Sequence, residues 1–393
     1  MLSQLAVTAL LGLTASAAPW GPGQGGDWGH GNGGNGNGWG GNGGWGGHGQ
    51  PPSQPENCTQ EPFKFPLSNG FPNVEVGSPE LLAIEKQAHG TLPNGPLPSK
   101  IQDATATTLQ LIAFNEIFEV AYFTSLLNNI TSGVYNVGSG AAKQIVENAI
   151  TAVQAQEELH ALGANAILQT AGRTTIQPCE YVFPVSDFDS SIALASTFTD
   201  VVLGTLQDAL NNFGTDGDDE LLALIGGVIG QEGEQNGFYR NLGGKIPSQL
   251  PFLTRSAGPF AFSALNQMFV VQGTCGNLDA IALPIFSPLT VATQNIQAQD
   301  QDLSFSFKTN GTATDTSDLH IVYINQQNVP VVEPLKNVQT QGDTVSFQAA
   351  FPFTENLMFG LTIAAVTNSA GPFAGADDVA AKALYGPGLI EIQ

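Results

Sequence analysis

The sequence has few basic residues, and this scarcity restricts its partners. Eleven Lys and Arg stand against 34 Asp and Glu, which gives a formal net charge of -23. A surface of this sign repels phosphate backbones and anionic lipid headgroups, so the composition argues against nucleic acid or a membrane surface as a partner. The same charge suits an acidic medium, in which part of the carboxylates is protonated.

Long apolar runs are missing after the first residues. Every later apolar stretch is interrupted by a glycine, a charge or an amide before it could cross a bilayer. The start differs, because the apolar run Leu5 to Leu13 is followed by the small residues Ala15-Ser16-Ala17. This pattern predicts a secretory signal peptide over residues 1–17, and therefore a secreted protein that is extracellular or held in a cell wall. Three sequons fit a glycoprotein: Asn57, Asn129 and Asn310.

Cysteine is also scarce, and its number is odd: Cys58, Cys179 and Cys275. In a secreted protein three thiols allow one disulfide and leave one cysteine over. Of the three possible pairs we favour Cys179 with Cys275, because each follows a predicted helix inside the folded region. Cys58 lies in a proline-rich lead-in and is left free or linked to another chain.

Changes in composition and periodicity divide the chain. Residues 18–62 are rich in Gly, Asn, Trp and Pro and have hardly a branched aliphatic residue, so we expect a disordered segment. Apolar positions then recur at steps of three and four through residues 63–283, which is typical of helices. From residue 284 to 393 the period changes to two, as Leu303 to Phe307 shows. We predict a helical bundle followed by a β-sandwich domain.

The helical region is expected to hold a short helix and a four-helix bundle. The short helix begins after Ser78, a favourable N-cap, and ends near Gly90. Four long helices follow over about residues 103–130, 141–170, 187–213 and 218–242. A further helix over about 260–271 is expected to pack across an end of the bundle.

Several polar residues fall on the inward, apolar faces of these helices. The first long helix places Glu116 and Glu119 there, the second Glu157 and His160, and the fourth Glu232 and Gln235. Buried carboxylates are costly unless a metal, a proton or a partner compensates them. Without a metal, these acids would share protons and hydrogen-bond to the neighbouring Gln235, Thr199 and Tyr239. Glu158, next to the inward face, is expected on the wet side with Gln154 and Asn165.

The β region yields about six short strands, with runs at residues 303–307, 320–324, 329–332, 344–347 and 361–366. We predict a small antiparallel sandwich of immunoglobulin-like size. No catalytic constellation stands out in it, and His320 is expected to be a half-exposed sheet residue.

Bundles that hold two metals use one Glu from each of two helices and a Glu-x-x-His pair from each of the other two. Here Glu157 and His160 form one complete pair, but the third helix presents Thr199 and the fourth Gln235 where ligands are needed. Carboxylates with one imidazole suit iron, manganese or zinc. The count therefore predicts at most one well-bound ion, held by Glu116, Glu157, His160 and Glu232, with Glu119 beside it.

Four motifs resemble those of the fungal secreted ferritin-like proteins, which include late sexual development and stress-response proteins. They are Asn115 to Phe123, Glu157-x-x-His160, Pro178-Cys179-Glu180-Tyr181 and Phe260 to Gln267. The resemblance covers about residues 63–288 and implies a ferritin-like four-helix bundle in a fungal extracellular or cell-wall setting. Relatives carry Glu in the third helix and Glu-x-x-His in the fourth, so Thr199 and Gln235 are departures from the family.

Two classes of function follow. In the first, the chain is a non-enzymatic extracellular protein of structural, stress or developmental role, with contacts to cell wall or matrix. In the second, it is a metal-binding protein, including iron- or manganese-dependent redox proteins, that uses the site in the bundle. The incomplete ligand set favours the first. Neither an oligomeric state nor a substrate follows from the sequence.

Overall fold

The computed structural model describes residues 61–248, 250–309 and 315–392. The predicted signal peptide, nearly all of the Gly- and Pro-rich segment, Cys58 and the sequons at Asn57 and Asn310 lie outside this part. Among the described residues, no helix combines the length and the apolar character that a bilayer-spanning segment requires.

The helical region has the predicted sequence of elements. Its helices are α1 (Pro79–Ala88), α2 (Asp103–Thr131), α3 (Gly140–Thr170), α4 (Phe188–Asp216), α5 (Leu222–Leu242) and α6 (Gly258–Met268), with short 3-10 turns η1 (Asp219–Leu221) and η2 (Leu278–Ala280).

Local capping explains several of the helix ends. The Ser78 side chain accepts a hydrogen bond from the backbone N–H of Leu81 at the start of α1. Asp187 and Ser190 form a reciprocal capping box at the start of α4, which satisfies backbone groups that the first turn leaves unpaired. Gly217 ends α4 in the left-handed region, with φ of 81°, where glycine has no steric penalty.

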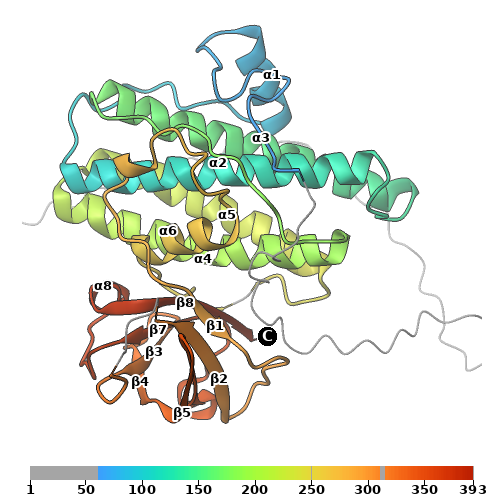
Figure 1. Ribbon diagram of the computed structural model, residues 1–393. Helices are drawn as coiled ribbons and strands as arrows, with labels where there is room; N and C mark the ends of the chain where they lie inside the picture. The colour runs from blue at the N-terminus through green and yellow to red at the C-terminus, as the bar shows by residue number, and fades with distance from the viewer. Residues whose placement is uncertain (1–60, 249, 310–314, 393) are drawn as a thin grey trace, which may run out of the picture. The chain divides into compact units, whose positions relative to one another are not determined.

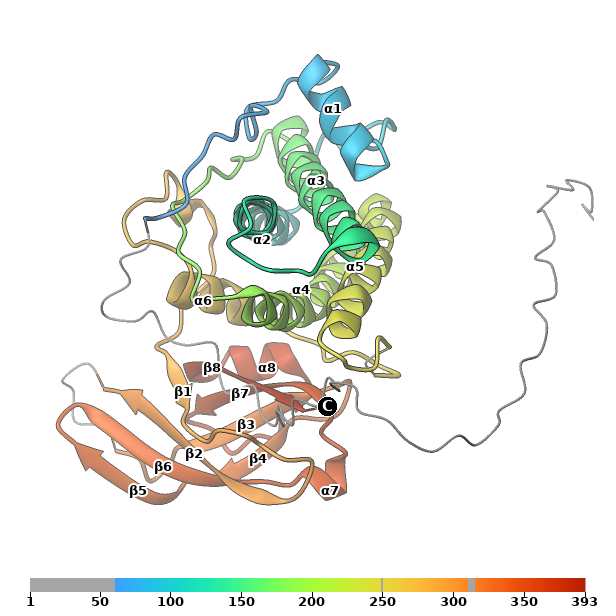
Figure 2. The ribbon, with the colours of Figure 1, turned by 90° about the vertical axis from the view of Figure 1, so that its right-hand side faces the viewer.

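Helices α2, α3, α4 and α5 form the bundle, and α1 packs on the outside of α3 (Figures 1 and 2). Aromatic rings fill the space between α2 and its neighbours: Phe118 stacks on Phe269 at 4.5 Å and meets Phe198 edge-on at 5.2 Å. Helix α6 contacts the middle of α2 and α4, where Phe262 packs on Phe114. The expectation that it crosses an end of the bundle was wrong, because its apolar residues fill the groove between those two helices.

The C-terminal region contains two antiparallel four-stranded sheets, in the orders β1-β2-β6-β5 and β4-β3-β7-β8. The strands are β1 (Leu289–Val291), β2 (Gln301–Lys308), β3 (His320–Asn325), β4 (Val331–Pro334), β5 (Lys336–Gln341), β6 (Thr344–Phe351), β7 (Gly360–Thr367) and β8 (Ala383–Ile392), and the short helices α7 (Phe353–Asn356) and α8 (Ala376–Ala380) lie among them. The strict alternation of β2 points Leu303, Phe305 and Phe307 into the space between the sheets. Strands β1, β5 and β8 were not predicted.

Strand β7 is buried on both faces along its whole length. One face joins the interior of the two sheets, through Ala364 and Val366. The other contributes Leu361, Ile363 and Ala365 to an apolar cluster with residues of α4 and α6. Polar contacts accompany this cluster, because the Thr254 hydroxyl donates to the carbonyl of Leu361 at 2.6 Å and Arg255 pairs with Asp208 and Asp377.

A disulfide joins Cys179 to Cys275, as predicted. It links the segment after α3 to the segment after α6, across 96 residues of sequence. The loop that it closes contains α4, α5 and α6, so the bond ties the second half of the bundle back to the first.

Candidate metal centre

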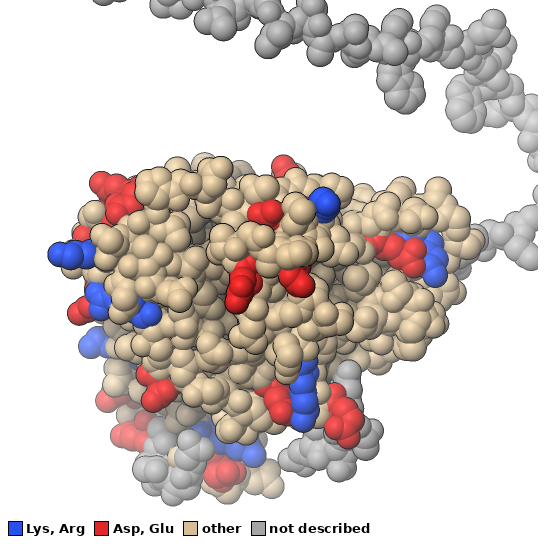
Figure 3. Space-filling view, turned by 90° about the horizontal axis from the view of Figure 1, so that it is seen from above, with Lys and Arg blue, Asp and Glu red and all other residues tan. Residues whose placement is uncertain are grey.

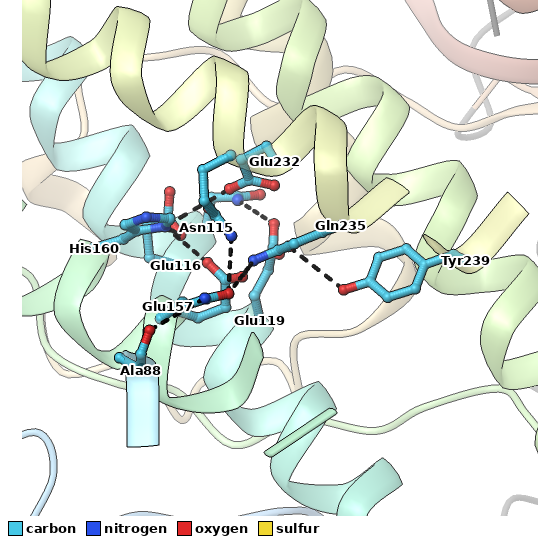
Figure 4. Close-up of polar contacts among 11 residues, drawn as sticks. Ala88, Asn115, Glu116, Glu119, Glu157, His160, Glu232, Gln235 and Tyr239 are labelled. Atoms are coloured by element: carbon cyan, nitrogen blue, oxygen red, sulfur yellow. Dashed lines mark hydrogen bonds and ion pairs between the residues drawn. The ribbon is translucent and has the colours of Figure 1, made fainter. Parts of the chain in front are cut away.

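Four ligand-type side chains from three helices meet inside the bundle (Figure 4). They are Glu116 of α2, Glu157 and His160 of α3, and Glu232 of α5, and one potential ligand atom from each lies within 4.8 Å of the others. The spacing of Glu157 and His160, three residues apart, puts both on the same side of α3. The inward faces of the three helices therefore deliver the set that their periodicity indicated.

The imidazole of His160 approaches all three carboxylates of the group. Its Nδ1 lies 2.9 Å from Glu157 Oε2, 3.4 Å from Glu116 Oε2 and 3.8 Å from Glu232 Oε1. Burial by itself would lower the pKa of His160, but the carboxylates of Glu157 and Glu116 outweigh it and hold that pKa well above its usual range. The protonated imidazole is therefore the positive charge that the carboxylates share when no metal is bound.

Burial has the opposite effect on the carboxyl groups. Desolvation raises the pKa of Glu116 to about 7, even though His160 opposes the shift. It also raises the pKa values of Glu119 and Glu232 well above their usual range, and the neighbouring carboxylates add to both shifts. Protons can thus neutralise part of this site, as the clustering of acids on the inward faces suggested.

The strongest indication of a cation is a set of buried oxygen atoms without hydrogen bonds. Oε1 of Glu116, both carboxyl oxygens of Glu232 and Oε2 of Glu119 have no hydrogen-bond partner among the described residues, and Oε2 of Glu116 has only the 3.4 Å approach of His160 Nδ1. A buried acceptor without a partner costs about 1–3 kcal/mol, and more when it is charged. Carboxylate oxygens and an imidazole nitrogen are ligands for iron, manganese and zinc. The residues present therefore fit a metal ion.

The chain matches a known family over this region. The family described as the ferritin-like domain matches residues 104–245, which run from the start of α2 to just beyond α5 and contain all four side chains. Residues 104–245 are a ferritin-like domain. A comparison of the whole chain with curated proteins finds no match.

One side of the centre of this ferritin-like domain is closed by an amide. Gln235 Nε2 donates to Glu157 Oε1 at 2.6 Å, and Gln235 Oε1 accepts from the Tyr239 hydroxyl at 3.4 Å. The amide nitrogen of Gln235 is therefore hydrogen-bonded to a carboxyl oxygen of Glu157 that would otherwise be available to bind a metal. Thr199 of α4 is fully buried, and its hydroxyl has no hydrogen-bond partner among the described residues. Neither side chain supplies an anionic ligand.

Glu119 belongs to the surroundings of the four-residue set, since it is not among the side chains whose ligand atoms come together. It is fully buried one turn from Glu116, and its Oε1 accepts from Asn115 Nδ2 at 2.8 Å. The role of Asn115 was missed in the sequence, although its position four residues before Glu119 allows the contact.

Glutamine side chains form a second chain of contacts that the sequence did not indicate. Gln156 Oε1 accepts from Gln231 Nε2 at 2.9 Å and from Gln235 Nε2 at 3.3 Å. Gln156 Nε2 in turn donates to the carbonyl of Ala88, at the end of α1, at 3.3 Å. These amides connect α1, α3 and α5 beside the site.

Glu158 was placed on the wet side, and this was wrong: it is fully buried. The side chain of Asn69 covers it and donates to both carboxyl oxygens, at 2.8 and 3.1 Å, while Gln154 Nε2 donates at 2.8 Å. Burial raises the pKa of Glu158 to about 7 against these hydrogen bonds. The predicted partner Asn165 instead bonds the backbone of Ile176.

Proposed function

We propose that this protein is a secreted ferritin-like protein whose domain binds one metal ion and has a non-enzymatic role. The observation that supports the ion is the set of four ligand side chains, three of them buried carboxylates, in which oxygens of Glu116 and Glu232 lack hydrogen bonds. Iron, manganese and zinc are the metals whose ligand preferences match three carboxylates and one imidazole. Glu116, Glu157, His160 and Glu232 are the proposed ligands.

The limit of one ion follows from the neighbours of the ligands. By the two-metal pattern, a second ion would need a carboxylate at the position of Thr199 and an imidazole at that of Gln235, and the amide of Gln235 already donates to Glu157. When bound, an ion of this group supplies a fixed positive charge and, for iron or manganese, one-electron chemistry. Glu157 accepts from Gln235, which fixes the orientation of its carboxylate, and His160 would have to be neutral to serve as a ligand.

Secretion is part of the same proposal. The predicted signal peptide and the disulfide between Cys179 and Cys275 both support an extracellular location, since disulfides persist in oxidising compartments. The resemblance to fungal secreted ferritin-like proteins supports a stress or developmental role, with cell wall or matrix as the surroundings.

Metal analysis of the purified protein tests the proposal. We expect one ion per chain in the wild type and at least a tenfold loss of affinity in His160→Ala, because the variant removes the only imidazole of the set. His320→Ala on β3 is the matched control and should retain the ion.

Two outcomes contradict parts of the proposal. An absence of metal under saturating iron, manganese and zinc overturns the metal site. Two stoichiometric ions with oxygen- or peroxide-dependent turnover, lost in His160→Ala, establish instead the alternative of a metal-dependent redox protein. That alternative has one structural observation in its favour, because a large cavity reaches Glu116 and His160.

A further inference from the structure

A cavity of about 1020 Å³ lies between α1 with the segment after it and helices α2, α3 and α5. Its volume is at the upper end of the range that small-molecule sites occupy. Leu109, Ile112, Ala164, Ile167 and Ile225 give it a buried apolar floor. Its rim is more exposed and includes Val76, Leu82 and His89.

The cavity meets the candidate metal centre. Glu116 and His160 are the two members of the four-residue set that line it. His160 keeps 16% of its side chain exposed, whereas the side chain of Glu116 is 1% exposed and those of Glu157 and Glu232 are fully buried. A molecule in the cavity would therefore lie against His160.

The charges around the cavity restrict the ligand. The residues that line it include the acids Glu85 and Glu116 and the histidines His89 and His160, but no Lys or Arg. The face that carries α1 is mostly uncharged, with acidic and basic side chains in small separate groups (Figure 3). An anionic headgroup would meet the carboxylates of Glu85 and Glu116, no Lys or Arg lines the cavity, and the positive charge of His160 is already paired with Glu157 and Glu116.

We propose that this cavity binds a small, uncharged, mainly hydrocarbon molecule with one polar end, such as a long-chain alcohol. The apolar floor excludes water from the hydrocarbon part, which contributes about 0.8 kcal/mol for each methylene group buried. The polar end finds hydrogen-bonding groups in His160 and Glu116 at the floor and in Glu85 and His89 at the rim. Binding of this ligand does not require that the metal site be occupied.

Two neighbouring glycines of α5 provide a matched pair of variants. Gly227 lines the cavity and Gly226 does not, while both are exposed and a Cβ at either would meet nothing within 4 Å. Leucine at either position improves helix propensity, so both variants should fold. Only Gly227→Leu places a side chain in the cavity.

The test uses 1-aminoanthracene as a fluorescent probe and 1-dodecanol and dodecanoate as competitors at pH 7, with the full-length secreted protein. We expect the probe to bind and dodecanol to displace it at least tenfold more effectively than dodecanoate. Gly227→Leu should weaken dodecanol binding at least tenfold, and Gly226→Leu should leave it unchanged. Both variants should retain the wild-type metal content, because neither changes a proposed ligand.

Three results would overturn the inference: no binding of the probe or of dodecanol, equal displacement by dodecanoate, or equal effects of the two leucine variants. Metal content measured on the same samples separates this outcome from a failure of the proposed metal site. A protein that binds no metal, but binds dodecanol more tightly than dodecanoate and loses this binding only in Gly227→Leu, would still support the proposed ligand of the cavity.

Discussion

Glu116 and Glu119 lie one turn apart on α2 and are both buried, but they differ in what they can do. Glu116 approaches His160, while Glu119 accepts a hydrogen bond from Asn115. The pKa of Glu119 is held well above its usual range by burial and by the neighbouring carboxylates, which favours the protonated, neutral form of its carboxyl group in the metal-free protein. Glutamine should therefore imitate Glu119 better than it imitates Glu116.

We expect Glu116→Gln to weaken metal binding at least tenfold, because an amide is a much poorer ligand than a carboxylate. Glu119→Gln on the same helix should change the affinity less than threefold. Competition of each variant with a colorimetric chelator for Mn²⁺ or Zn²⁺ measures the difference. Equal losses in the two variants would make Glu119 a ligand of the same rank as Glu116.

At this scale, spacing predicted the ligand-type side chains but not their neighbours. Residues three or four apart share one side of a helix, which was enough to gather Glu157 with His160. The burial of Glu158 depends instead on Asn69, 89 residues earlier and outside any helix. Contacts such as Gln231 to Gln156 depend on how α5 is rotated against α3, which no single-helix pattern contains.

Among the elements, the four long helices were predictable because of their apolar period, and α1 and α4 also have side-chain N-caps. The missed strands lack such signals. Strand β5 is polar and mostly exposed, as an edge strand can be. Strand β8 contains Gly386-Pro387, which interrupts the alternation, although its C-terminal half is buried.

The end of β8 brings a carboxyl group against the helices. Glu391 is buried close to Asp200 of α4, Arg240 of α5 and Lys245 after α5. Burial and Asp200 raise the pKa of Glu391 well above its usual range, although Lys245 and Arg240 oppose the shift. The folded protein therefore keeps a proton on Glu391 to a higher pH than the unfolded chain does.

We expect Glu391 to make the protein less stable as the pH rises above about 4.5, the usual pKa of a Glu carboxyl, because only the unfolded chain then releases this proton freely. One such proton changes the free energy of unfolding by up to about 1.4 kcal/mol per pH unit. Glu391→Gln should reduce this slope, measured by urea unfolding from pH 4.5 to 8. Glu234→Gln, exposed on α5, is the control, and an unchanged slope in Glu391→Gln would contradict the expectation.

For the whole molecule, the order of a helical bundle followed by two antiparallel sheets was predictable from one change of period near residue 284. The contacts between helices and sheets were not predictable. They depend on the outer face of β7: its nearly continuous apolar run over residues 361–366 is consistent with a strand buried on both sides, but the run does not say which elements cover it.

Secretion and the disulfide make one joint prediction at this scale. The protein recovered from culture medium should begin after about residue 17, and its non-reducing peptide map should join Cys179 to Cys275.

The double variant Cys179→Ser, Cys275→Ser should lose roughly 2–5 kcal/mol of the free energy of unfolding, measured in urea, because the bond closes a long loop. Reduction of the wild type should reproduce this loss and leave the variant unaffected. An intact Met1, or a peptide in which Cys58 is joined to either partner, would contradict the scheme.

The two-sided burial of β7 also bears on modularity. A sheet with one face in water can be moved between proteins as a unit, whereas the sheet β4-β3-β7-β8 contributes apolar side chains to two separate clusters. If residues 284–393 were transplanted without the helices, Leu361, Ile363 and Ala365 would lose their partners from α4 and α6 and form part of an exposed apolar patch. Such patches favour aggregation. The change of period near residue 284 thus marks a change of architecture, and engineering of either half has to respect the surface of the other.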